Sequence, residues 1–96
     1  MSVRLSGGAE ADLAALADYV EQEHGTEAAE RLLNYLFAEF EKLGDAPGMG
    51  SWRRWLQPGE RCWPRGAYLI IYKAEDPVLI TAVLHGSRNR RERPGR

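Results

Sequence analysis

The chain has a single cysteine, Cys62, and only two histidines among its 96 residues. One thiol excludes an intrachain disulfide, and the few Cys and His side chains lack the spacing of metal ligands. No apolar run approaches the roughly 20 residues that a membrane-spanning helix needs, and the first residues do not read as a secretory signal. We therefore expect a protein of the reducing cytoplasm that uses no metal or cofactor and does not contact a membrane.

Charge is distributed unevenly along the chain. Residues 1–50 contain ten acidic and three basic side chains, whereas residues 51–96 contain ten basic and four acidic ones. The two halves therefore carry net charges of −7 and +6. Two interpretations are open: an acidic, solvated helical layer with a solubilising basic tail, or a cationic surface that meets an anionic partner.

The first half predicts two amphipathic helices. Ser6 is expected to cap the first helix, Gly25 to end it, and Thr26 to cap the second. The short connection implies an antiparallel helical hairpin. Apolar residues recur at helical spacing in both segments, first at Leu13, Leu16, Ala17 and Val20, then at Ala29, Leu32, Leu33, Leu36, Phe37, Phe40 and Leu43.

Short strands are predicted at Val3–Leu5 and in the last third of the chain. Residues 61–63 form a strand that turns into a central strand ending at Lys73, and a hairpin turn leads to a last strand over 78–84. Pro64 has no N–H to donate, so it belongs at a strand end or a sheet edge. Cys62, beside Trp63, is expected to be packed rather than reactive.

The order β-α-α-β-β-β predicts an α+β domain in which the helical hairpin packs on one face of a small antiparallel sheet. Residues 1–88 form this domain, and residues 89–96 form a basic tail. The central strand places apolar groups on both faces. The second face therefore needs cover, either from a partner or from residues 52–56.

The last strand ends in polar residues that suit a contact. His85 offers an imidazole that can donate or accept a hydrogen bond, and Gly86 lets the chain turn before Arg88. A cation that starts from a fixed strand end can make a geometry-specific contact with a carboxylate or phosphate. The structural alternative is that Arg88 pairs with an acid of the helical layer and His85 is a hydrogen-bonded residue at the sheet rim.

Arg53 and Arg54 lie between Trp52 and Trp55. Such interleaving is typical of single-stranded nucleic-acid binding. The more ordinary interpretation is that one or both tryptophans fold onto the sheet, with the arginines stacked on them or paired with acids.

The last third of the chain carries the pattern G-x-Y-x-I-x-Y from Gly66 to Tyr72, followed by V-L-H-G-x-R from Val83 to Arg88. Together with the P-x-x-G of residues 47–50 and the Ala11-Asp12-Leu13 segment, it resembles the ParE branch of the RelE/ParE superfamily of bacterial toxins. The resemblance covers nearly the whole chain. Gly7-Gly8 and the loop of residues 52–55 depart from the pattern.

The resemblance implies the toxin of a type II toxin–antitoxin pair. Its usual action is inhibition of DNA gyrase by protein contact, without chemistry of its own. An antitoxin resembling ParD would neutralise it, and operator DNA would be reached only through that antitoxin. We expect the target contact to use His85, Arg88, Arg90 and Arg91. The antitoxin contact is expected to draw on Leu13, Leu16, Val20, Leu36 and Phe40, a pool shared with the core.

Two alternatives remain open. A RelE-like ribosome-dependent mRNA endonuclease would use His85 as acid, Arg88 as phosphate clamp and Arg61 as orienting group. It is disfavoured because the sheet offers one lysine, Lys73, and arginine is a poor proton shuttle. A degenerate toxin would act only in autoregulation with its antitoxin.

Overall fold

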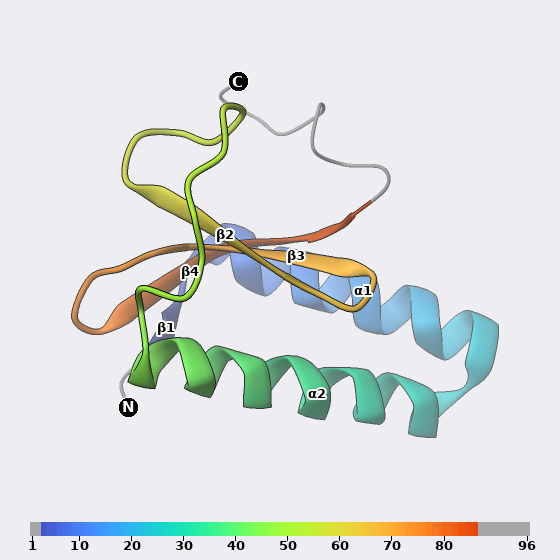
Figure 1. Cartoon of the computed structure of the whole chain (residues 1–96). Coiled ribbons are helices and arrows are strands. Elements are labelled where there is room, and N and C mark those ends of the chain that lie inside the picture. The colour runs from blue at the N-terminus through green and yellow to red at the C-terminus, as the bar shows by residue number, and fades with distance from the viewer. Residues whose placement is uncertain (1–2, 87–96) are drawn as a thin grey trace.

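A computed structural model describes residues 3–86. The elements are β1 (Val3–Leu5), α1 (Gly7–His24), α2 (Thr26–Asp45), β2 (Glu60–Arg65), β3 (Tyr68–Lys73) and β4 (Val78–His85). The strands form one four-stranded sheet in the order β1-β4-β3-β2, and both helices lie on one of its faces (Figure 1). The expected α+β architecture and element order are confirmed.

The sheet is mixed rather than wholly antiparallel. The β2–β3 and β3–β4 pairs are antiparallel as expected. However, β1 runs parallel to β4, with Val3 opposite Val78 and Leu5 opposite Ile80. This pairing joins residues about 75 positions apart, so local sequence patterns carry no signal for its direction.

The first turns of α1 complete the edge of β4 beyond the short β1. Ser6 caps the helix as predicted, because its Oγ accepts the N–H of Ala9 at 3.0 Å. The same hydroxyl donates to the carbonyl oxygen of Thr81 at 3.3 Å. Asp12 accepts the N–H of Val83 at 2.9 Å. The helical layer is thereby tied to the sheet by hydrogen bonds as well as by packing.

The junction of the two helices differs from the expectation by one residue. Gly25 ends α1 and also stands as the N-cap of α2, with a φ of 97° that suits glycine. Thr26 is therefore the first residue of α2 and not its cap. Its hydroxyl donates instead to Glu21 Oε2 at 3.0 Å.

The main core lies between the helical hairpin and the sheet. Its buried side chains from α1 and α2 follow the predicted apolar stripes, and Tyr72 of β3 is wholly buried. The members are Ala9, Leu13, Leu36, Phe40, Leu43, Trp63, Ile70, Tyr72, Val78, Ile80 and Val83.

A second, smaller core covers the other face of the sheet. After α2 the chain climbs past the sheet to its far side (Figure 1). There the buried Leu56, with the partly buried Trp55, packs on side chains of the three C-terminal strands. Residues of the predicted 52–56 segment thus supply cover from within the chain. Cys62 belongs to this cluster and is fully buried, as expected.

Candidate protein-interaction site

The two edges of the sheet differ in how well they are closed. On the β2 edge, Ser51 and Cys62 exchange two backbone hydrogen bonds of 3.1 and 2.8 Å, and Pro64 has no N–H to offer. On the β1 edge, the strand pairs with β4 on one side and with no other strand of residues 3–86. An open edge is a template for the addition of another strand.

An apolar hollow of about 270 Å³ lies beside the open edge. It is lined by Val3 and Leu5 of β1 and by Phe37, Phe40 and Glu41 of α2. The rings of Phe37 and Phe40 meet edge to face, 5.5 Å between centroids. Phe40 is buried, whereas Phe37 is 45 % exposed. A large apolar side chain next to an open strand edge is a combination suited to binding a partner segment.

The five apolar residues expected to contribute to the antitoxin contact divide by burial. Leu13, Leu36 and Phe40 are buried members of the main core. Leu16 and Val20 are only partly buried. A core side chain has little surface left for a partner. Of the five residues, Leu16 and Val20 are therefore the two that still have surface for an antitoxin contact.

Phe37, which the sequence-based selection did not include, is the exposed apolar side chain beside the open edge. The buried stripe of α2 follows Leu36, Phe40 and Leu43 at spacings of four and three residues. Successive helical residues point about 100° apart, so Phe37 lies off the stripe that contains Leu36. The angular offset of Phe37 from Leu36 can be derived from the sequence alone, and it indicates that Phe37 lies outside the buried stripe.

The end of β4 is fixed as the sequence suggested. His85 lies opposite Tyr68 in the antiparallel register, and the two rings meet edge to face, 5.9 Å apart. The N–H of Gly86 donates to the carbonyl oxygen of Ala67 at 2.7 Å. A Cβ at Gly86 would lie 3.2 Å from that oxygen, so the close approach favours glycine. Arg88, Arg90 and Arg91 lie outside the described residues.

Arg61 does not join His85. Its Nε donates to the carbonyl oxygen of Gly50 at 3.0 Å, and its Nη2 donates to the carbonyl oxygens of Gly48 and Gly50. In the strand register, Arg61 of β2 lies opposite Tyr72 of β3, and His85 of β4 lies opposite Tyr68 of β3. These positions are about 13 Å apart along the strand direction. Arg61 is therefore a clamp on the loop after α2.

Arg65 joins β2 to α2. Its Nε lies 3.2 Å from Glu39 Oε1, and its guanidinium stacks 3.7 Å from the ring centroid of Trp63. Glu39 is buried and also pairs with Lys42 at 3.2 Å. Within β2, the structure thus shows an arginine stacked on a tryptophan.

Residues 3–86 contain no helix long and apolar enough to cross a membrane. Within the same segment, no group of three or more His, Cys, Asp or Glu side chains is placed to hold a metal ion.

The model of one family, the ParE toxin of the type II toxin-antitoxin system parDE, matches residues 3–90. The chain belongs to the ParE toxin family. Toxin ParE1 of Caulobacter vibrioides is 37 % identical to it over 92 residues, which are 96 % of either chain. A solved structure of the chromosomal ParDE TA system from P. aeruginosa has the same fold, with a TM-score of 0.73 at 22 % identity, covering 88 % of this chain and 95 % of that one.

Membership in the ParE family confirms the resemblance inferred from the strand patterns. The matched region extends past the described residues and includes Arg88 and Arg90. This chain is thus a ParE-type toxin of a type II toxin–antitoxin system.

Proposed function

We propose that this ParE-type toxin acts in the cytoplasm by binding DNA gyrase, without catalysis of its own, and is neutralised by a ParD-like antitoxin. The single observation that carries the antitoxin part is the open β1 edge beside the hollow that exposes Phe37. The solved neighbour is described as a ParDE system, in accord with a ParD-like partner. Operator DNA would be reached through the antitoxin.

The proposed antitoxin site has two parts, the open edge of β1 and the apolar hollow beside it. An extended antitoxin segment would add to β1 through backbone hydrogen bonds, which give affinity with little dependence on sequence. An apolar side chain of that segment or of an adjoining helix would enter the hollow against Phe37. Burial of apolar area at about 25 cal/mol per Å² would then supply most of the affinity.

A non-enzymatic action is supported by the placement of the nuclease candidates. Of the expected set, Arg61 is occupied by the carbonyl oxygens of Gly48 and Gly50 and lies away from His85. A cleaving set needs its acid and its cations around one phosphate. Among residues 3–86, His85 and Arg61 do not converge in this way.

The experiment is a supercoiling assay with purified DNA gyrase holoenzyme and relaxed plasmid, alongside growth measurements in a bacterial host. The toxin should inhibit supercoiling and accumulate cleaved plasmid, and equimolar ParD-like antitoxin should restore activity. Growth arrest with rapid mRNA cleavage and no effect on gyrase would overturn the proposal in favour of a RelE-like nuclease. Antitoxin binding without growth arrest would identify a degenerate toxin.

A further inference from the structure

The hollow beside the open edge of β1 carries charge of one sign. Four of the five residues that line it are apolar, and the fifth, Glu41, is acidic. Glu41 is exposed and forms no ion pair within residues 3–86. The nearest cation in the sequence of β1, Arg4, stands between Val3 and Leu5, which line the hollow. Its side chain therefore lies on the opposite face of the strand and does not neutralise Glu41.

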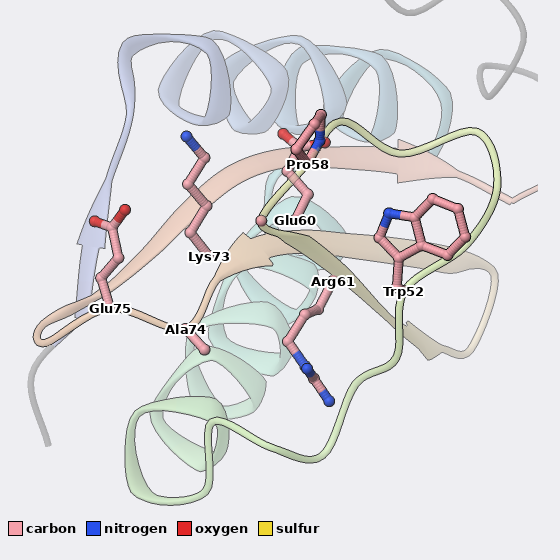
Figure 2. Close-up of a pocket in the computed structure, with 8 residues that line it drawn as sticks. Trp52, Pro58, Glu60, Arg61, Lys73, Ala74 and Glu75 are labelled. Atoms are coloured by element: carbon pink, nitrogen blue, oxygen red, sulfur yellow. The ribbon is translucent and has the colours of Figure 1, made fainter.

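The larger hollow, of about 520 Å³, has no such bias. It lies where β2 begins and β3 ends (Figure 2). Its charged lining is balanced and consists of two bases and two acids, which are Arg61, Lys73, Glu60 and Glu75. The charge of a binding partner can therefore be inferred for the hollow at β1 and not for this one.

The acidic character continues along the flank of α2 that borders the hollow at β1. At about 100° per residue, Glu30 and Glu41 lie within about 40° of Phe37 around the helix axis. Both carboxylates are exposed, and neither forms an ion pair within residues 3–86. The two bases of α2, Arg31 and Lys42, lie about 120° and 140° away from Phe37. This flank thus presents an exposed aromatic ring between two unneutralised carboxylates.

We propose that the antitoxin segment that binds this flank is basic. An apolar side chain of the segment enters the hollow against Phe37, and lysine or arginine side chains on either side of it meet Glu30 and Glu41. The inference rests on the proposed function, in that an antitoxin occupies the open edge, and it adds the charge of that partner. Glu30 and Glu41 are eleven residues apart, about 16 Å along the axis, which about five extended residues can span.

Opposite charges across this contact would raise the association rate and fix the register of the bound segment. The surrounding elements extend the same field, because residues 3–45 contain ten acidic and three basic side chains. An acidic segment fits this surface less well, since its carboxylates would lose solvation beside Glu41 without gaining a counter-charge. The phosphates of a nucleic acid would be repelled for the same reason.

The test measures binding of the purified antitoxin encoded beside the toxin gene to toxin variants at position 41. At low salt, Glu41→Gln should weaken binding about threefold and Glu41→Lys about tenfold, mainly through a slower association rate. Both losses should shrink at about 0.5 M salt, because screening weakens the contact between exposed charges. In a complementary series, replacing the basic residue of the antitoxin that faces position 41 with Glu should restore part of the affinity for Glu41→Lys.

Glu23→Lys is the matched control. It makes the same change in net charge at an exposed position of α1, beside the turn between the helices. That turn lies about 22 Å from Glu41 along α2. The affinity of Glu23→Lys for the antitoxin should stay within about twofold of wild type. The melting temperatures of all the variants should stay within about 3 °C of wild type, because the substituted positions are exposed.

Tighter binding by Glu41→Lys would overturn the inference, and so would equal affinities of wild type and Glu41→Lys at low salt. If Phe37→Ala still loses affinity in that case, the antitoxin site stands and only the basic character of the partner is refuted. Unchanged affinity in both Phe37→Ala and Glu41→Lys would refute the antitoxin site as well.

Two further measurements would identify another occupant and overturn the inference. Tighter antitoxin binding after removal of residues 89–96 would indicate that the basic end of this chain competes for the acidic flank. Self-association of the isolated toxin that Phe37→Ala abolishes, measured by sedimentation, would indicate that a second copy of the chain covers the hollow. The expected result is a monomeric toxin whose antitoxin affinity does not rise on truncation.

Discussion

The hydroxyl of Tyr72 donates a hydrogen bond of 2.6 Å to the carbonyl oxygen of Pro47. The hydroxyl oxygen of Tyr72 in turn accepts the N–H of Gly50 at 2.8 Å. A wholly buried side chain of the central strand thereby ties both ends of the P-x-x-G segment to the sheet. This contact links two motifs that were separate in the sequence. Tyr72 is the last residue of the G-x-Y-x-I-x-Y pattern, and it holds the loop that the P-x-x-G segment forms.

Replacing Tyr72 with phenylalanine should lower the free energy of unfolding by about 1–3 kcal/mol, because the N–H of the buried Gly50 would lose its acceptor. Urea denaturation of the purified toxin measures this change. Tyr19→Phe, at an exposed position on α1, is the control and should stay within about 0.5 kcal/mol of wild type. Equal urea midpoints for both variants would show that the hydroxyl bridge does not stabilise the fold.

Gly50→Ala should destabilise the protein by about 1–3 kcal/mol through steric overlap. A Cβ at this position would lie 2.7 Å from the Tyr72 hydroxyl and 2.8 Å from the carbonyl oxygen of Cys62. Gly48→Ala is the matched control, because no atom lies within 4 Å of its added Cβ. Thermal melting of the two variants should separate them, and a Gly48→Ala protein that melts as low as Gly50→Ala would argue against the steric explanation.

Phe37→Ala should weaken antitoxin binding by about 10- to 100-fold, since the ring borders the hollow beside the open strand. Isothermal titration with the ParD-like antitoxin measures this loss. Tyr35→Ala provides the control on the same helix, because Tyr35 is 40 % exposed and two residues, or about 200°, away from Phe37. Phe37→Ala should still arrest growth when no antitoxin is present. Similar losses of affinity in both variants would place the antitoxin elsewhere on the helical hairpin.

His85→Ala should reduce growth arrest only modestly. The imidazole packs edge to face on Tyr68, so its removal changes the shape of the strand end and not a proton-transfer step. Growth curves and transcript integrity, followed together after induction, test this expectation. Rapid mRNA cleavage by the wild type that disappears in the variant would instead assign His85 a catalytic role.

The sequence by itself determined the local elements of this toxin. The cap at Ser6, the glycine between the helices and the apolar stripes of α1 and α2 depend on neighbours within one or two turns. The β3–β4 hairpin depends on alternation and a short turn, which are also local. Pro64 lies in β2, an edge strand, because a residue without an N–H is excluded from the middle of a ladder.

Only the tertiary structure decided which distant residues meet. The parallel pairing of β1 with β4, the loop clamp of Arg61 and the stacking of Arg65 on Trp63 are contacts between elements. Burial also divided the two tryptophans of the 52–55 loop, since Trp55 packs on the sheet whereas Trp52 is exposed. The physical reason is that periodicity sets the face of an element on which a side chain lies, while the opposing surface is assembled from residues far away in the chain.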